Sequence, residues 1–213
     1  MAEVSLRRLH TRERLMAAAA ELFVERSVQA ASVEEICERA GFTRGAFYSN
    51  FESKDELCLA LVRQRGEQLV IVTQQAMRMV PEGQLDQSAV SEVVAKVVAI
   101  LAAGLEMDGN WVEVRSELRL YALRNSAFRP VLIEVERAAF ALAAAEIETM
   151  LQRQKAKLRI PMNQFLITVD AYFMHTRLNE ILNEGTRPEE SWRTGLEHLV
   201  TALVELPTTP PEG

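Results

Sequence analysis

Apolar residues recur at spacings of three and four along almost the whole chain, and no sustained alternation of apolar and polar residues suggests a strand. Between about Thr11 and Arg26 the apolar positions form one stripe, and most charged residues fall off it, which predicts an amphipathic helix. Similar stretches follow up to about residue 206. The pattern predicts an all-α fold with about nine helices.

The stretch "SVEEICERAG", residues 32–41, predicts a short second helix. Ser32 can cap its first turn while Glu35 reaches back to the cap, as in an S-x-x-E capping box. Gly41 ends this helix because glycine readily adopts the left-handed conformation. Both ends of the helix are therefore set by local sequence.

A third short helix is predicted directly after "GFT". Thr43 can cap it, and Phe47 and Phe51, four residues apart, would share its buried face. Two short helices joined by a turn of three to four residues with a glycine have the form of a helix-turn-helix, here at about residues 32–51. In that motif the second short helix enters the major groove of DNA.

The rest of the chain predicts longer helices. Ser53 and Glu56 repeat the capping-box pattern and open a fourth helix that stops near Pro81. Five more helices follow, and the last two cover about 162–184 and 189–206. The sequence thus predicts a helix-turn-helix domain at 1–52, a helical domain at 53–206, and a flexible proline-rich tail at 207–213.

Charge is distributed unevenly between these parts. The 213 residues carry a net charge of -6, which argues against nucleic-acid binding over the whole surface. Residues 1–66 hold ten Lys and Arg against ten Asp and Glu, while the remainder holds 14 against 20. The acidity therefore belongs to the later part of the chain, and any contact with DNA must be local.

Other classes of protein receive little support from the sequence. Cys37 and Cys58 form no metal signature, and we expect two reduced, packed thiols, with a redox-sensing pair as the alternative. The chain begins without a signal-peptide core and has no run of membrane-spanning length, so we expect a cytoplasmic protein that does not bind membranes. Three histidines, no clustered carboxylates and no phosphate-cradling loop argue against an enzyme, a cofactor or a metal site.

The third helix carries the residues that suggest DNA binding. On that helix Arg44, Gly45, Tyr48 and Ser49 lie away from the phenylalanine face. Arginine pairs with O6 and N7 of guanine, and an exposed glycine in so short a helix suits close approach to another surface. The DNA-contacting residues that we expect are Ser32, Thr43, Arg44, Gly45, Tyr48, Ser49 and Lys54. The arginines at positions 7, 8, 12 and 14 could form a basic arm that reaches DNA. The alternative is that they belong to a mobile, solvated N-terminus.

The stretch "SVEEICERAGFTRGAFYSNFESKDEL" resembles the DNA-binding domain of the TetR/AcrR family of bacterial transcriptional regulators. That family reads T-x-G-x-(L/F)-Y-x-x-F in its third helix, followed by x-x-K-x-x-L, and the resemblance covers about residues 8–60. Asn50 departs from it, because the family often has His or Tyr there in contact with phosphate. The resemblance implies a homodimer that binds a palindromic operator as a repressor and is released by a small molecule.

The resemblance also implies that residues 1–52 are the DNA-binding domain and that residues 53–206 are a ligand-binding and dimerisation domain, with an effector pocket and a dimer interface. The pocket candidates are Trp111, Arg115, Phe140, Tyr172 and His175. Arg115 and Arg119, four apart, repel each other unless an anion, a neighbouring glutamate or solvent intervenes. Plain burial in the core is the alternative for the two aromatic residues Trp111 and Phe140 and for His175.

The dimer interface is expected on the last two helices, with burial inside the monomer as the alternative. Its candidates are Leu178, Ile181, Leu182, Leu196, Leu199, Val200 and Leu203. An alternative function is a DNA-binding factor that acts through a protein partner without a small-molecule ligand.

Overall fold

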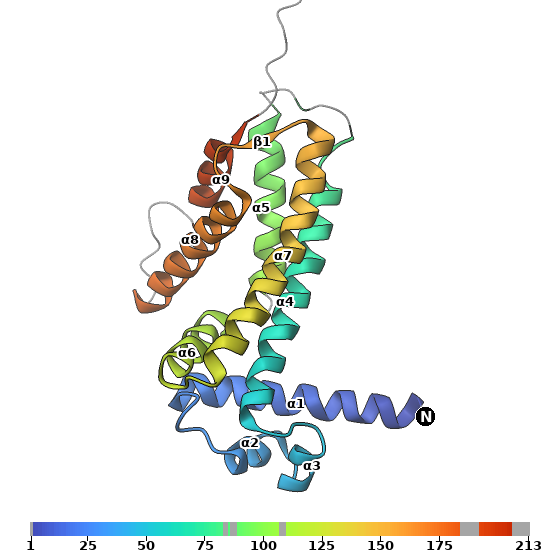
Figure 1. The fold of residues 1–213 in the computed structure, drawn as a ribbon, viewed down its shortest axis with the longest axis vertical. Coiled ribbons are helices and arrows are strands. Elements are labelled where there is room, and N and C mark those ends of the chain that lie inside the picture. Colours follow the sequence, from blue (N-terminus) through green and yellow to red (C-terminus); the bar gives the residue numbers. More distant parts are fainter. Residues whose placement is uncertain (1, 83–84, 86–88, 107–109, 184–191, 206–213) are drawn as a thin grey trace, which may run out of the picture. The chain divides into compact units, whose positions relative to one another are not determined.

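The computed structural model describes residues 2–82, 85, 89–106, 110–183 and 192–205, which are almost entirely helical (Figure 1). Over these residues the chain forms nine helices, in agreement with the predicted all-α class: α1 (Ala2–Arg26), α2 (Val33–Ala40), α3 (Arg44–Tyr48), α4 (Lys54–Arg78), α5 (Val90–Glu106), α6 (Trp111–Arg124), α7 (Phe128–Gln154), α8 (Met162–Leu182) and α9 (Trp192–Leu203).

Two features differ from the expected elements. Helix α1 begins at Ala2 instead of near Thr11. Two strands of two residues each, β1 (Lys157–Leu158) and β2 (Val204–Glu205), pair antiparallel, and the amide of Arg159 donates to the carbonyl of Leu203 at 2.9 Å. Two residues are too few to show alternation, so the sequence pattern could not indicate these strands. The proline-rich tail at 207–213 lies outside the described residues.

The chain divides into two compact units. The first comprises Met1–Gly66 and Asp108–Arg137, and the second comprises Glu67–Met107 and Ala138–Gly213. Helices α4 and α7 contribute residues to both units. The first unit therefore combines the helix-turn-helix with α6 and the start of α7, while the functional boundary at residues 52 and 53 stays a prediction.

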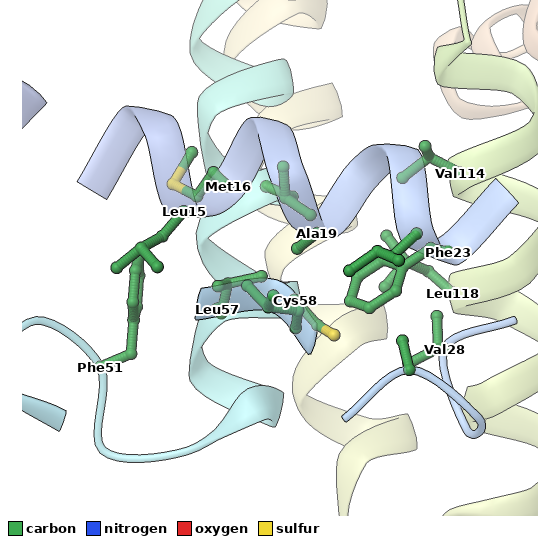
Figure 2. Close-up of a cluster of buried hydrophobic side chains, with 14 of the residues drawn as sticks. Leu15, Met16, Ala19, Phe23, Val28, Phe51, Leu57, Cys58, Val114 and Leu118 are labelled. Carbon is green, nitrogen blue, oxygen red and sulfur yellow. The ribbon is translucent and has the colours of Figure 1, made fainter. Parts of the chain in front are cut away.

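One continuous hydrophobic core fills the first unit (Figure 2). Phe23 of α1 is fully buried, as are Leu57 and Cys58 of α4, and Leu118 of α6 belongs to the same cluster. Burial of this apolar surface stabilises the short helices α2 and α3, which are too short to be stable alone. Both cysteines are buried and free, and burial raises the pKa of both thiols.

Local caps form at the ends of α2 and α3 as the sequence predicts. The Ser32 hydroxyl accepts from the amide of Glu35 at 3.2 Å, and the Glu35 carboxylate accepts from the amide of Ser32 at 2.9 Å. Gly41 ends α2 at φ 71°, and the Thr43 hydroxyl accepts from the amide of Ala46 at 3.2 Å. These caps fix the turn that separates the two helices.

The cap of α4 differs in one contact. The Ser53 hydroxyl accepts from the amide of Glu56 at 3.1 Å, as in a capping box. The Glu56 carboxylate, however, accepts from the amide of Glu52 at 2.6 Å, one residue before the cap. The sequence therefore predicted the start of α4 correctly and its second cap contact only approximately.

The second unit contains its own core. Val90, Val94 and Val98 of α5 pack against Trp192 and Leu196 of α9. Half-buried residues of α8, among them Tyr172 and Phe173, pack against the same cluster. Among the described residues, no helix is both long enough and apolar enough to cross a membrane.

Candidate nucleic-acid interface

Helix α3 presents an exposed face next to a buried one. Phe47 is fully buried, whereas Arg44, Gly45, Tyr48 and Ser49 are exposed, as is the cap residue Thr43. The helix has five residues, so this face is short and close to the N-terminal end. The structure thus gathers five of the seven expected DNA-contacting residues on one surface.

Two side chains hold the Arg44 guanidinium on this surface. Its Nη1 lies 2.6 Å from Oε1 of Glu34, which comes from the first turn of α2. Its Cζ lies 5.9 Å from the centre of the Tyr48 ring. The Tyr48 hydroxyl, and after it the Glu34 carboxylate, raises the pKa of Arg44 above its usual value. Arg44 therefore remains a cation with a preferred orientation.

Gly45 is not required by the packing of the chain itself. A Cβ built at this position would meet the Thr43 hydroxyl oxygen at 3.7 Å, an ordinary contact, and its φ lies outside the left-handed region. Glycine nevertheless lowers helix stability relative to alanine by about 0.5–1 kcal/mol. The absence of a side chain here makes sense if another molecule approaches the backbone closely.

Three arginines of α1, which we term the arginine brace (Arg8, Arg12 and Arg14), hold the ends of α2 and α3. Nη2 of Arg8 donates to the carbonyl of Ser49 at 3.3 Å, and Nη1 of Arg12 donates to the carbonyl of Asn50. Nη2 of Arg14 donates to the carbonyl of Ala40 at 2.7 Å. Cations at helix C-termini satisfy the last carbonyls and interact favourably with the helix dipole.

The brace gives these arginines a role that the sequence did not indicate. The guanidinium of Arg12 also lies 4.1 Å from the centre of the Phe51 ring, a cation–π contact at the end of the helix-turn-helix. The partners lie 26 to 41 residues away in sequence, too far for a local pattern to reveal. Arg8, Arg12 and Arg14 therefore support α2 and α3 in this structure.

Lys54 and Ser32, the other two expected contact residues, are half-buried. Nζ of Lys54 donates to the carbonyls of Val28 at 2.7 Å and Ala31 at 2.8 Å, in the turn between α1 and α2. The Ser32 hydroxyl is engaged in the capping box. Contact of either residue with a phosphate stays a prediction, and both have structural partners within the chain.

Asn50 is almost completely buried, with 8% of its surface exposed. Its Nδ2 donates to the carbonyl of Ala46 at 2.8 Å, while its buried Oδ1 has no hydrogen-bond partner. The Asn50 side chain is therefore buried and bonded within the chain.

A polar cluster joins the start of α4 to the junction of α6 and α7. Oδ1 of Asp55 accepts from the Tyr121 hydroxyl at 2.8 Å, and Oδ2 accepts from Nδ2 of Asn125 at 3.3 Å. The same Asn125 caps α7, because its Oδ1 accepts from the amides of Ala127 and Phe128. Burial, followed by the hydrogen bond with Asp55, raises the pKa of Tyr121. The cluster thus ties three helices of the first unit together.

Residues 15–61, which include α2 and α3 with their exposed face, match the family model described as "Bacterial regulatory proteins, tetR family". This segment of the chain is therefore a DNA-binding domain of the TetR family. The chain is 42% identical over 67 residues to the HTH-type transcriptional activator FasR of Mycolicibacterium smegmatis, which covers 32% of this chain and 31% of that relative. It is 33% identical over 90 residues to the HTH-type transcriptional regulator SrpR of Pseudomonas putida, a match that covers 42% of this chain and 39% of that relative.

The matches in sequence thus span only about a third of these curated relatives, whereas the likeness in fold to solved structures extends over most of the chain. The crystal structure of FadR from Bacillus subtilis in complex with stearoyl-CoA has a TM-score of 0.62, with 18% identity, 89% of this chain covered and 95% of that chain. At that identity the likeness concerns the fold. The TetR-family assignment confirms the resemblance stated from residues 8–60.

The five pocket candidates are divided between the units. Trp111 and Arg115 belong to the first unit, and Phe140, Tyr172 and His175 belong to the second. His175 is exposed, and its Nε2 lies 2.9 Å from Nδ2 of Asn179. The structure does not gather the five residues into one unit, so a role in effector binding stays a prediction for each.

The carboxylate of Glu136 in α7 lies between Arg115 and Arg119, where a bound anion could otherwise relieve the repulsion between the two arginines. Its Oε1 lies 3.1 Å from Nε of Arg115, and its Oε2 lies 3.0 Å from Nη2 of Arg119. Arg115 is buried, so this carboxylate compensates its charge inside the protein. Among the described residues, no group of three His, Cys, Asp or Glu side chains is placed to hold a metal ion.

The candidates for the dimer interface fall into two groups. On α9, Leu196 is buried in the monomer core, and Leu199 and Val200 pack against the same core, while Leu203 is half-buried at the end of the helix. On α8, Leu178, Ile181 and Leu182 are exposed.

Ile167 of α8 is also exposed, with 66% of its surface accessible, and the sequence analysis did not select it. It lies 11 residues before Leu178, three helical turns on the same face of α8. Exposed Ala171 and half-buried Met174 lie between them on that face. Their spacing of four, three and four residues was the signal that could have identified an apolar stripe on α8.

Proposed function

We propose that the chain is a homodimeric, DNA-binding regulator of transcription that acts as a repressor and is released from its operator by a small molecule. The observation that carries the proposal is the exposed face of α3, where Arg44, Gly45 and Tyr48 lie together in a helix-turn-helix of the TetR family. Arg44 contacts guanine, and Thr43 and Tyr48 contact the DNA backbone. Gly45 allows the backbone of α3 to approach the groove.

Dimerisation rests on α8, which carries apolar residues on two sides. One side packs in the monomer, as Val169 and Phe173 show, and the other presents the apolar stripe (Ile167, Ala171, Met174, Leu178, Ile181 and Leu182). An exposed stripe of this kind marks a protein interface. Pairing of two copies through α8, with α9 supporting it, presents two α3 helices to a palindrome, as helix-turn-helix dimers do.

Repression follows from occupancy of the operator, and release requires an effector with unequal affinity for two states of the protein. The fold is shared with FadR from Bacillus subtilis, whose structure contains stearoyl-CoA, which supports an effector site in the helices of the second unit. The relative FasR is named an activator, so the sign of regulation needs a direct test. A reporter gene behind the operator should rise when the chain is deleted, whereas a fall would show activation.

Selection of random duplex DNA by the purified chain tests the function. We expect an enriched inverted repeat, and Arg44→Ala should weaken binding to that repeat by roughly 5- to 150-fold and relax the preference at one base pair of each half-site. Absence of an enriched motif at low salt would contradict the proposal. Any compound that weakens operator binding should bind the free protein more tightly than the DNA complex by the same factor.

A further inference from the structure

The exposed ion pair between Arg44 and Glu34 contributes little to folding. The side chains are 60% and 55% exposed, and exposed ion pairs stabilise proteins only weakly because water screens them. The pair nevertheless joins α2 to the residue of α3 that reads DNA under the proposed function. The position of the ion pair is therefore explained better by a role in DNA binding than by a role in stability.

The geometry of the pair leaves the reading atoms of Arg44 available. Glu34 engages Nη1, so Nε and Nη2 can still donate to O6 and N7 of one guanine. The Tyr48 ring lies near the same guanidinium, and half of the Tyr48 surface is exposed. A side chain held by two neighbours loses less conformational freedom when it binds a base.

The negative charge of Glu34, in contrast, weakens binding to DNA of any sequence. A carboxylate beside the groove is repelled by the phosphates, and this weakens binding to every sequence. At a site with the matching guanine, the oriented contact of Arg44 offsets this repulsion. Specificity is the difference between the two affinities, so the repulsion, which acts on both duplexes, cancels from it, and the orientation of Arg44 by Glu34 supplies the discrimination.

We propose that Glu34 is a specificity-determining residue, which holds the Arg44 guanidinium for a guanine and lowers binding to DNA that lacks it. The inference rests on the proposed function and assigns a further residue to the DNA-reading face. It concerns a contact between α2 and α3, two helices of the same compact unit.

The test compares three variants on two duplexes. One duplex is the selected inverted repeat, and in the other the base pair whose preference Arg44→Ala relaxes is changed. Glu34→Gln removes the charge, and Glu34→Asp keeps the charge but shortens the side chain. Glu38→Gln is the control, because Glu38 is an exposed carboxylate one turn further along α2. Thermal unfolding verifies that each variant is folded, and fluorescence anisotropy gives the affinities.

We expect Glu34→Gln to lower the ratio of the two affinities by about three- to tenfold, part of the discrimination that one bidentate base contact supplies. This change arises mainly from tighter binding to the altered duplex. Glu34→Asp should lower the ratio by weaker binding to the operator, and Glu38→Gln should leave the ratio unchanged. In an Arg44→Ala background, Glu34→Gln should no longer affect the ratio.

Two results would overturn the inference: an equal ratio for Glu34→Gln and Glu38→Gln, or an effect of Glu34→Gln that persists without Arg44. Both would leave the regulator proposal intact, provided that the unmodified chain still selects a repeat that Arg44→Ala degrades. Failure of the unmodified chain to select any repeat would instead remove the proposed function itself.

Discussion

Glycine occupies two positions of this chain, Gly45 and Gly195, for different reasons. A Cβ at Gly195 of α9 would lie 1.8 Å from the Tyr172 hydroxyl oxygen, so a larger residue would force the Tyr172 side chain of α8 to move. A Cβ at Gly45 of α3 would meet nothing closer than 3.7 Å. The first glycine is therefore explained by packing within the chain, whereas the second is explained by the proposed contact of α3 with DNA.

Replacement of each glycine by alanine should have opposite effects on stability. We expect Gly45→Ala to raise the free energy of unfolding by about 0.5–1 kcal/mol, because alanine favours the helix. The added methyl group should at the same time weaken operator binding by about tenfold, as overpacking does in a close interface. Gly195→Ala should lower the free energy of unfolding by about 1–3 kcal/mol. Urea unfolding and fluorescence anisotropy measure both effects, and unchanged DNA binding by Gly45→Ala would show that α3 does not approach DNA closely.

For single residues, the sequence predicts those contacts whose two partners are close together in the chain. Ser32, Gly41 and Thr43 take the predicted cap positions, because capping depends on residues three or four positions away. Lys54 shows the limit of such prediction, since its carbonyl partners Val28 and Ala31 lie 26 and 23 residues earlier in the chain, before α2 and α3. Spacing alone gave no indication of that contact.

Among the elements, the polar cluster of Asp55, Tyr121 and Asn125 connects the start of α4 with α6 and α7. Two of its contacts cross 66 and 70 residues of sequence. The Tyr121 ring also packs on Phe128, with 5.2 Å between ring centres. Since Asp55 lies in the first turn of α4, directly after the helix-turn-helix, the cluster connects the end of that motif to α6 within one compact unit.

Loss of this cluster should lower stability without exposing apolar surface. Asn125→Ala removes the cap of α7 and the contact with Asp55, so we expect a loss of about 1–2 kcal/mol in the free energy of unfolding. Tyr121→Phe keeps the ring and removes one hydrogen bond, so the expected loss is about 0.5–1.5 kcal/mol. Urea unfolding of the single and double variants measures their coupling, and strictly additive losses would contradict a cooperative cluster.

Helix positions were predictable because apolar periodicity is a local property, as for the stripe of α1 that includes Leu15 and Phe23. Periodicity does not identify the partner of an apolar face, which explains why Leu196 was assigned to the dimer interface but packs in the monomer core. It also missed the carboxylate of Glu136, which lies 21 residues from Arg115 and joins it from another helix. Contacts between helices depend on the tertiary arrangement.

For the whole molecule, the proposed homodimer can be tested at its interface. The apolar stripe of α8 is exposed in the single chain, and Ile181 on it is 37% exposed. Ile181→Lys should therefore leave the fold of the chain intact and place two lysines in the proposed interface. We expect this variant to sediment as a monomer at concentrations where the unmodified chain is a dimer, and to bind the operator more weakly.

Leu123→Lys provides the control for that substitution. Leu123 of α6 is 67% exposed and belongs to the first unit, outside the apolar stripe. Analytical ultracentrifugation of both variants separates loss of the interface from a general effect of added charge. A dimer that persists in Ile181→Lys would place the interface elsewhere on the chain.

The arginine brace bears on how such a protein can change over evolutionary time. Its guanidiniums bind the backbone carbonyls of Ala40, Ser49 and Asn50, which every amino acid possesses. The position of α3 is thereby uncoupled from the identity of its outward-facing side chains. Under the proposed function, mutations at those side chains shift the recognised operator while the scaffold persists, so a duplicated copy could acquire a new set of target genes through few substitutions.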